Sequence, residues 1–257
     1  MNDESAAVAR RALALIDLTD LGDSTPAGID ALCARAAFGP HGSTAAVCVW
    51  PAFVEQCARL LAGTGVRVAT VVNFPEGGTD VAGTVAETAA ALGAGADEID
   101  LVLPYRAFLS GRRQAAAEMV AAVRAQARPP ALLKVILETG AYPNQREIAA
   151  AAELAIEQGA DFVKTSTGKT EQSASPAAAA TMLQVIRASG RPVGFKPSGG
   201  IRTVSDAAVY LGLADEIMGP HWACPATFRF GASGLLDALE AAIEGLAPND
   251  EGEPASY

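Results

Sequence analysis

The sequence DFVKTSTGK, residues 161–169, joins a short apolar run to a polar turn. A continuous run of apolar and β-branched residues is typical of a strand that is buried on both faces of a parallel sheet. Lys164 stands inside this run, where burial of an ammonium group is costly and favours loss of the proton. A neutral lysine is a nucleophile, and Gly168 with Lys169 could hold an anion beside it. The stretch therefore predicts a parallel sheet that carries an amine nucleophile next to an anion site.

On both sides of this stretch, apolar strand candidates alternate with alanine-rich segments of helical character. We expect strands at 45–50, 67–74, 98–103, 132–138, 161–166, 193–197, 215–218 and 227–232. We expect helices at 5–19, 28–38, 52–62, 80–93, 111–127, 145–158, 176–189, 203–212 and 234–245, and a loop at 219–226.

Eight strands, with a helix after nearly every one, predict an α/β fold of the (β/α)₈ TIM-barrel type, with short N-terminal helices. We expect one domain over residues 1–246, followed by a flexible, acidic C-terminal tail at 247–257. An open doubly wound sheet is the alternative. It would need a GxGxxG fingerprint, and none follows the first expected strand.

The composition narrows the classes of function. A net charge of −10 argues against nucleic acid and anionic membrane surfaces as partners. Two histidines, and four cysteines without CxxC spacing, predict no metal site and no disulfide framework. The N-terminus lacks the pattern of a secretory signal, and no apolar run is long enough to span a membrane. We therefore expect a reduced, cytoplasmic protein that acts on small molecules.

The placement of the lysines is more specific. Lysine occurs only four times among 19 lysines and arginines, at Lys134, Lys164, Lys169 and Lys196. Lys134, Lys164 and Lys196 lie in successive apolar strand candidates, and such close like charges lower the pKa of at least one amine. Asp100 lies inside another candidate, between two apolar residues. We expect these four side chains to form a functional group, because a barrel carries its active site at the C-terminal ends of its strands.

Other polar residues near strand ends have simpler interpretations. Cys48 in an apolar strand is more often a small core residue than a functional one. Asp97 and Glu98 begin their strand at the end opposite the site, so we expect both to be structural. Glycine-containing turns follow the later strands at Gly168-Lys169, at Gly199-Gly200 with Arg202, and at Gly231 with Ser233. Together these turns favour a phosphate site, since their backbone N–H groups can approach an anion closely.

Several longer stretches resemble the deoxyribose-phosphate aldolases, a family of class I (Schiff-base) aldolases. They are GADEIDLVLPYRAFLSG (95–111), LLKVILETG (132–140), GADFVKTSTGK (159–169), VGFKPSGGIRT (193–203) and FRFGAS (228–233). The early ALALIDLT (12–19) and TAAVCVWP (44–51) also match, so the resemblance spans nearly the whole chain in order. It implies a TIM barrel, which agrees with the strand and helix pattern.

The resemblance also implies roles. The family reversibly cleaves 2-deoxy-D-ribose 5-phosphate to D-glyceraldehyde 3-phosphate and acetaldehyde, in deoxyribonucleotide catabolism, without a cofactor. Lys164 would form the Schiff base, Lys196 would perturb its pKa, and Asp100 would transfer protons through water. The further positions expected to line the site are Lys134, Asp17, Thr19, Cys48 and Thr165. The phosphate pocket would comprise Gly168, Lys169, Gly199, Gly200, Arg202, Gly231 and Ser233. Relatives often form dimers, so a homodimer is one assembly to consider.

Two features at the C-terminal end qualify the resemblance. Relatives commonly carry a second serine where this chain has Gly234, which predicts weaker phosphate binding. Some relatives end in a tyrosine that assists proton transfer, and the terminal Tyr257 is expected to act in this way. Two other functions stay open: a Schiff-base lyase for another phosphorylated sugar, and an inactive barrel that only binds phosphate.

Overall fold

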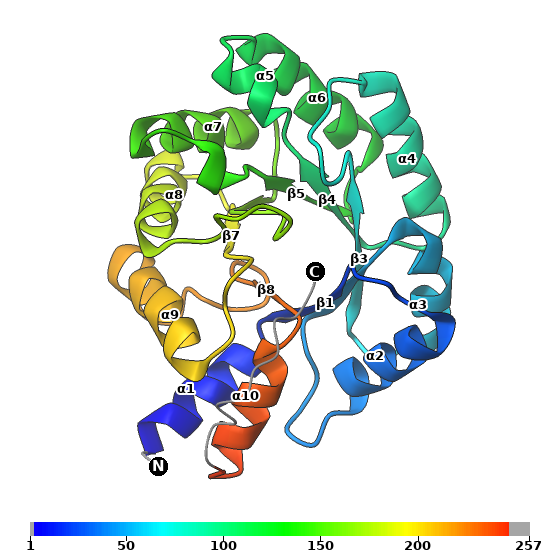
Figure 1. Ribbon diagram of the computed structural model, residues 1–257, viewed down its shortest axis with the longest axis vertical. Helices are drawn as coiled ribbons and strands as arrows, with labels where there is room; N and C mark the ends of the chain where they lie inside the picture. Colours follow the sequence, from blue (N-terminus) through cyan, green and yellow to red (C-terminus); the bar gives the residue numbers. More distant parts are fainter. Residues whose placement is uncertain (1–2, 247–257) are drawn as a thin grey trace.

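The computed structural model describes residues 3–246, which form a barrel of eight parallel strands inside a ring of helices (Figure 1). The strand order is β7-β6-β5-β4-β3-β2-β1-β8, and single bridges from Phe195 to Phe228 and from Ser198 to Gly231 join β7 to β8. The predicted (β/α)₈ fold is therefore confirmed. The strands are β1 Ile16–Asp20, β2 Ala46–Val49, β3 Arg67–Val72, β4 Glu98–Val102, β5 Leu132–Ile136, β6 Phe162–Lys164, β7 Gly194–Lys196 and β8 Phe230–Ala232.

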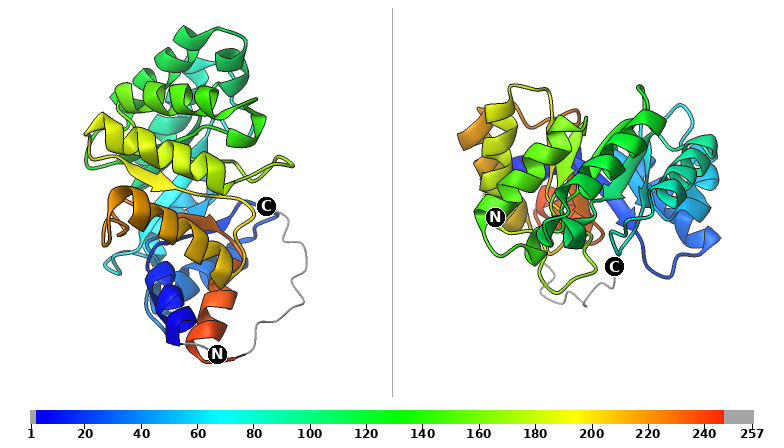
Figure 2. Two further views of the ribbon diagram at one scale, coloured as in Figure 1. Left: turned by 90° about the vertical axis from the view of Figure 1, so that its left-hand side faces the viewer. Right: turned by 90° about the horizontal axis from the view of Figure 1, so that it is seen from above.

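Consecutive helices lie side by side around the outside of the barrel (Figure 2). Several begin at a side-chain cap, such as Thr25, Asn144, Ser175 or Thr203, which accepts a hydrogen bond from a first-turn N–H group. The helices are α1 Asp3–Leu13, α2 Pro26–Phe38, α3 Val54–Leu60, α4 Val81–Gly93, α5 Tyr105–Leu109, α6 Arg113–Gln126, α7 Gln145–Glu157, α8 Pro176–Ser189, α9 Val204–Met218 and α10 Leu235–Ile243.

The first strand was misassigned from the sequence. Residues 16–19 were expected to belong to the helix at 5–19, but α1 ends at Leu13 and β1 follows. β1 pairs with both β2 and β8, so its partners come from distant parts of the chain. Local helical periodicity could not reveal these pairings, which close the barrel.

The expected strand at 215–218 is also wrong, because these residues form the last turn of α9. The helix expected at 203–212 continues to Met218. Asp215 then pairs with Arg11 of α1 at 2.6 Å, which ties the end of α9 to the first helix. The residues after Met218 form the expected loop, and β8 begins at Phe230 instead of 227.

The strands separate an apolar layer from a polar interior. Ile99 and Leu101 of β4 belong to the apolar core, whereas Asp100 between them contacts lysines of other strands. This alternation follows from the two-residue period of a strand. No helix within residues 3–246 has the length and apolar character needed to cross a membrane.

Close packing between β6 and β7 generates a stability prediction. A Cβ atom at Gly194 would overlap the ring of Phe162, its register partner. We expect Gly194→Ala to lower the free energy of unfolding by about 1–3 kcal/mol, the usual cost of overpacking a core. Urea-induced unfolding measures this difference.

The control is Gly212→Ala in α9, where no atom lies within 4 Å of the added Cβ. An alanine in a helix interior is favoured over glycine by about 0.5–1 kcal/mol. Equal effects of the two variants would show that crowding between the strands does not limit this position.

Candidate active site

Strand register brings the predicted catalytic residues together. Asp100 of β4 lies opposite Lys134 of β5, and Lys164 of β6 lies opposite Lys196 of β7. All four side chains are buried, with Lys164 only 3% exposed. Because the strands are parallel and adjacent, these residues converge on one region inside the barrel.

Asp100 is the centre of this group. Its Oδ1 atom accepts a hydrogen bond from Lys134 at 2.6 Å. Its Oδ2 atom accepts bonds from Lys164 and Lys196, each at 2.8 Å. One carboxylate therefore holds three lysine nitrogens close to one another, which would otherwise repel as ammonium groups.

A second set of ion pairs lies against the first. The carboxylate of Asp17 accepts hydrogen bonds from Lys196 and from Arg229, the latter at 2.6 Å. Glu98 lies 2.6 Å from Lys134 and 2.9 Å from Arg229. The three carboxylates Asp17, Glu98 and Asp100 can thus be balanced by Lys134, Lys196 and Arg229. Lys164 is the fourth cationic side chain of this network, so the network is balanced when Lys164 is neutral.

The pKa directions agree with this charge balance. Burial and the nearby Lys196 charge lower the pKa of Lys164, and the opposing effect of Asp100 does not cancel them. Burial would also lower the pKa of Lys196, but Asp100 and Asp17 outweigh it and hold the pKa above its usual value. Burial would raise the pKa of Asp100, but the three lysines hold it well below the normal range. One amine is therefore poised to lose its proton beside a lysine that keeps its own.

Glu98 and Arg229 were missed as members of the site. Glu98 was expected to be structural, and no role was predicted for Arg229. A usable signal was present, because Glu98 is two residues before Asp100 and so shares its face of the strand. Arg229 precedes Gly231 by the same spacing. The partners of both residues, however, depend on the closure of the barrel.

The other residues expected to line the site have mixed surroundings. Asp17 is fully buried among cations, and the Thr19 hydroxyl donates to the Asp17 carbonyl at 2.9 Å. Cys48 packs with Leu21 and other apolar residues, and burial raises the pKa of its thiol. Thr165 donates to the Ser198 carbonyl and accepts from the Ser198 N–H group, which links the ends of β6 and β7. A direct contact of these four residues with a substrate stays a prediction.

The glycine turns of the predicted phosphate pocket converge in part. A Cβ atom on Gly199 would lie 3.4 Å from the Cα atom of Gly168, and Gly231 forms a bridge with Ser198. Gly168, Gly199 and Gly200 have φ angles of 79°, 85° and 80°, which favour glycine. The N–H-rich turns after β6, β7 and β8 therefore lie near one another. Ser233 is half-buried in the turn after β8.

The cationic side chains of that pocket point elsewhere. Lys169 donates from Nζ to the Leu21 carbonyl at 2.9 Å. The side chain of Arg202 is exposed, and its backbone N–H group donates to Asp206. Gly234 is the residue before α10 and provides no side-chain cap. Contact of these two side chains with a phosphate stays a prediction.

Glu138 holds the turn after β6 in place. It is fully buried and has a φ angle of 60°, a region that is unfavourable for residues other than glycine. Its carboxylate accepts hydrogen bonds from the Thr167 N–H group at 3.3 Å and from the Thr170 hydroxyl at 3.2 Å. The short turn that contains Gly168 and Lys169 is thus tied to the end of β5.

Two predictions about the site are limited by the described residues. Tyr257 lies outside them, so the position of its side chain is not described. Within residues 3–246, no group of three or more His, Cys, Asp or Glu side chains has an arrangement that could hold a metal ion. Reaction without a metal or cofactor stays a prediction from the sequence.

Comparison with known proteins identifies the family. Residues 12–239 match the family model described as DeoC/LacD family aldolase. The chain belongs to the DeoC/LacD aldolase family.

Individual relatives agree with this assignment. This aldolase is 56% identical over 246 residues to a deoxyribose-phosphate aldolase of Agrobacterium fabrum, covering 95% of this chain and 92% of the relative. A crystal structure from Coccidioides immitis, of a protein proposed to be a deoxyribose-phosphate aldolase, shares 34% identity with a TM-score of 0.79, covering 91% and 86% of the two chains. A tetrameric deoxyribose-phosphate aldolase from Aeropyrum pernix shares 25% identity with a TM-score of 0.73, covering 93% and 92%.

The buried ion pairs of this aldolase generate a second stability prediction. Glu98→Gln removes the carboxylate that balances Arg229 and Lys134 and leaves uncompensated buried charge. We expect a loss of about 3–5 kcal/mol in the free energy of unfolding, the usual cost of breaking a buried pair. The control is Glu76→Gln, which breaks an exposed pair with Arg106 and should change stability by at most about 1 kcal/mol. Equal changes in denaturant midpoint for the two variants would contradict a structural role for the buried network.

Proposed function

We propose that this aldolase reversibly cleaves 2-deoxy-D-ribose 5-phosphate to D-glyceraldehyde 3-phosphate and acetaldehyde, through a Schiff base on Lys164. The observation that carries the proposal is the contact between Lys164 and Asp100, with Lys196 bound to the same carboxylate oxygen. Burial and the Lys196 charge lower the pKa of Lys164 despite the opposing effect of Asp100, and the carboxylates beside Lys196 keep that lysine charged. The family membership and the 56% identical relative support the same reaction.

The first chemical step needs a neutral amine. Neutral Lys164 attacks the C1 aldehyde to form a carbinolamine. The carbinolamine hydroxyl then takes up a proton from the solvent and leaves as water, which gives a protonated imine between Nζ and C1. The iminium withdraws electrons from the C2–C3 bond and so prepares it for cleavage. Lys196 is held by two carboxylates, and its positive charge opposes protonation of the free Lys164 amine before the attack.

The second step removes the proton of the C3 hydroxyl. We assign this role to Asp100, acting through a water, with Lys134 holding the second carboxylate oxygen. In the free enzyme, hydrogen bonds from three lysines make Asp100 a weak base. Conversion of Lys164 to an imine takes donor protons away from Asp100, which increases the basicity of the carboxylate. The C2–C3 bond then breaks and releases D-glyceraldehyde 3-phosphate.

The third step restores the amine. The enamine left on Lys164 takes a proton at C2, and hydrolysis of the resulting iminium releases acetaldehyde. We keep Tyr257 as the candidate donor of that proton, on the basis of the sequence alone. The substrate phosphate would lie against the turns that contain Gly168, Gly199 and Gly231, with Lys169 and Arg202 supplying charge.

Two further predictions concern the cellular location and the assembly of the protein. A cytoplasmic location stays a prediction. A homodimer is one candidate assembly, and the tetrameric relative from Aeropyrum pernix is another model for it. An inactive phosphate-binding barrel is disfavoured, because it would not need three buried lysines around one aspartate.

Borohydride trapping tests the nucleophile. We expect incubation with deoxyribose 5-phosphate and borohydride to add a reduced adduct to the peptide that contains Lys164, as measured by mass spectrometry and peptide mapping. Lys164→Met should form no adduct. Lys169→Met, which removes the lysine outside the barrel interior, should still be labelled at saturating substrate. An adduct on Lys134 or Lys196 would overturn the assignment, and labelling of no lysine would favour the binding-protein alternative.

The pH dependence tests the role of Lys196. Reaction requires neutral Lys164, so kcat/KM should rise with pH to a limb set by a pKa below that of an ordinary lysine. Lys196→Met removes the like charge and leaves Asp100 freer to bind Lys164, and both effects raise the pKa of Lys164. We expect the ascending limb to move to higher pH. A limb that stays in place, or moves to lower pH, would show that Lys196 does not control the amine.

A further inference from the structure

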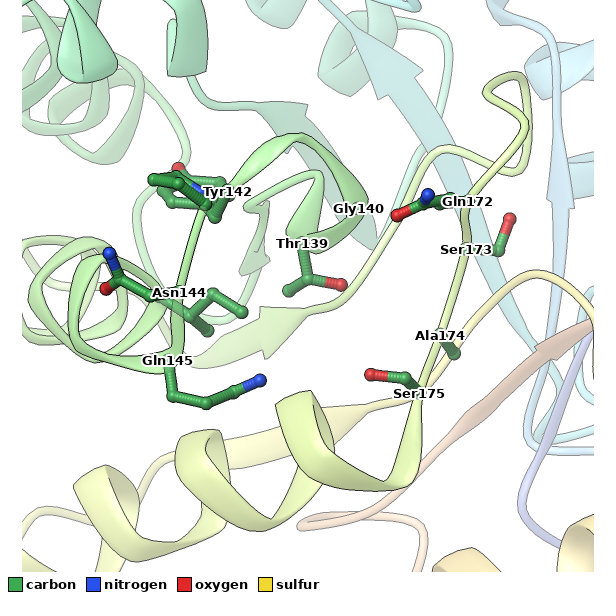
Figure 3. Close-up of a pocket in the computed structure, with 11 residues that line it drawn as sticks. Thr139, Gly140, Tyr142, Asn144, Gln145, Gln172, Ser173, Ala174 and Ser175 are labelled. Atoms are coloured by element: carbon green, nitrogen blue, oxygen red, sulfur yellow. The ribbon is translucent and has the colours of Figure 1, made fainter.

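A second hollow lies outside the barrel interior, between the loops that follow β5 and β6 (Figure 3). It has a volume of about 390 Å³, which is in the range of sites for small ligands. None of its lining residues belongs to the predicted phosphate pocket, and none is charged. The lining residues are Thr139, Gly140, Tyr142, Pro143, Asn144, Gln145, Ile148, Gln172, Ser173, Ala174 and Ser175.

The Thr139 hydroxyl is a buried polar group that lacks a hydrogen bond among the described residues. Thr139 is only 4% exposed, and its Oγ1 atom has no hydrogen-bond partner among the described residues. Figure 3 shows this hydroxyl pointing into the space between the two loops. Buried hydroxyls nearly always have a partner, because an unpaired one loses its hydrogen bonds to water without replacing them. A ligand atom bound in the hollow is therefore expected to supply the missing hydrogen bond.

Two neighbouring side chains add donors. The Oε1 atom of Gln145 accepts a hydrogen bond from Thr181 at 2.9 Å, so the amide nitrogen is the end that faces the hollow (Figure 3). The Oγ atom of Ser175 accepts from the Ala178 N–H group at 3.2 Å, which leaves its own proton for another acceptor. Thr139, Gln145 and Ser175 can therefore all donate toward the same space.

Two helices also begin at this hollow. α7 starts at Gln145 and α8 at Pro176, each directly after a cap that lines the space. Both follow parallel strands, so both direct their N-termini toward the same end of the barrel. The N-terminus of a helix carries a partial positive charge and free N–H groups, which together favour an anion even without a charged side chain.

We propose that this hollow binds the phosphate group of a small phosphomonoester, or free phosphate, at a site separate from the catalytic pocket. The Thr139 hydroxyl, the Gln145 amide and the Ser175 hydroxyl donate to its oxygens, and the N-termini of α7 and α8 stabilise its charge. The volume leaves room for a short polar group attached to the phosphate. An uncharged lining suits a ligand that binds and leaves readily.

The position of the hollow connects it to the reaction. Thr139 directly follows Glu138, which holds the turn around Thr167, and its own N–H group donates to the Thr165 carbonyl at 2.8 Å. On the opposite wall, a Cβ atom on Gly199 would lie 2.6 Å from Ser173. A ligand between these walls restrains the segment that carries Gly168 and Lys169. Occupancy is therefore expected to lower KM for the phosphorylated substrate.

Titration of ¹⁵N-labelled protein with inorganic phosphate tests the site by NMR. In the unchanged protein, we expect the amides of Gly140 and Ala177 to shift with one dissociation constant and those of Gly200 and Gly231 with another. Gln145→Glu places a carboxylate among the donors. It should weaken the response of Gly140 and Ala177 about tenfold or more, since hydrogen bonds to charged groups contribute about 1.5–3 kcal/mol. Gly200 and Gly231 should respond as before.

The matched control is Gln126→Glu, which adds the same charge at the exposed end of α6 and should leave both responses unchanged. Thr139→Val removes only the unpaired hydroxyl and should also weaken the first response. Borohydride labelling of Lys164 checks that each variant is folded and competent. A titration with glycerol 3-phosphate then identifies the source of the phosphate: tighter binding than inorganic phosphate indicates a phosphomonoester, and equal binding indicates the free anion.

Three outcomes would overturn the proposal. In the first, Gly140 and Ala177 do not respond at phosphate concentrations that saturate Gly200, or no amide of either set responds. In the second, Gln145→Glu leaves the response of Gly140 and Ala177 unchanged. In the third, Gln145→Glu weakens both sets equally, which would mean that only the catalytic pocket binds phosphate.

Discussion

The reactive groups of this barrel are positioned by one carboxylate, that of Asp100. Asp100 accepts hydrogen bonds from three lysines, and the closeness of their nitrogens depends on its negative charge. Because all of these groups are buried, each interaction acts in a medium that screens charge poorly. The same burial that makes an ammonium costly favours loss of a proton from Lys164. Burial of the Lys164 amine, which is costly for the stability of the fold, therefore also makes the amine reactive.

The surrounding network decides which lysine loses its proton. Lys196 has Asp17 as a second partner and Lys134 has Glu98, whereas Lys164 has Asp100 alone among the described carboxylates. Arg229 joins Asp17 to Glu98 and completes the balance of charge. The two lysines with additional partners keep their protons. The reactivity of Lys164 is therefore a property of six other side chains drawn from five strands or strand ends.

Loops outside the barrel interior position residues of the predicted phosphate pocket and of the proposed second anion site. Glu138 and Thr139 follow the end of β5, and their side chains have different roles. Glu138 ties down the turn that contains Gly168, while Thr139 directs an unpaired hydroxyl into the hollow beside α7 and α8. Adjacent residues of one loop thus connect the predicted phosphate pocket to the proposed second anion site.

The barrel, most of its elements and the group formed by Lys134, Lys164, Lys196 and Asp100 could be predicted from the sequence. Those residues break the apolar pattern of their own strands, so local composition reveals them. Tertiary contacts were needed to show that 16–20 is a strand, that 215–218 ends a helix, and that Glu98 and Arg229 complete the charge network. The physical reason is that strand pairing and buried ion pairs join residues far apart in the chain: Arg229 meets Asp17 only after β8 has closed the barrel against β1.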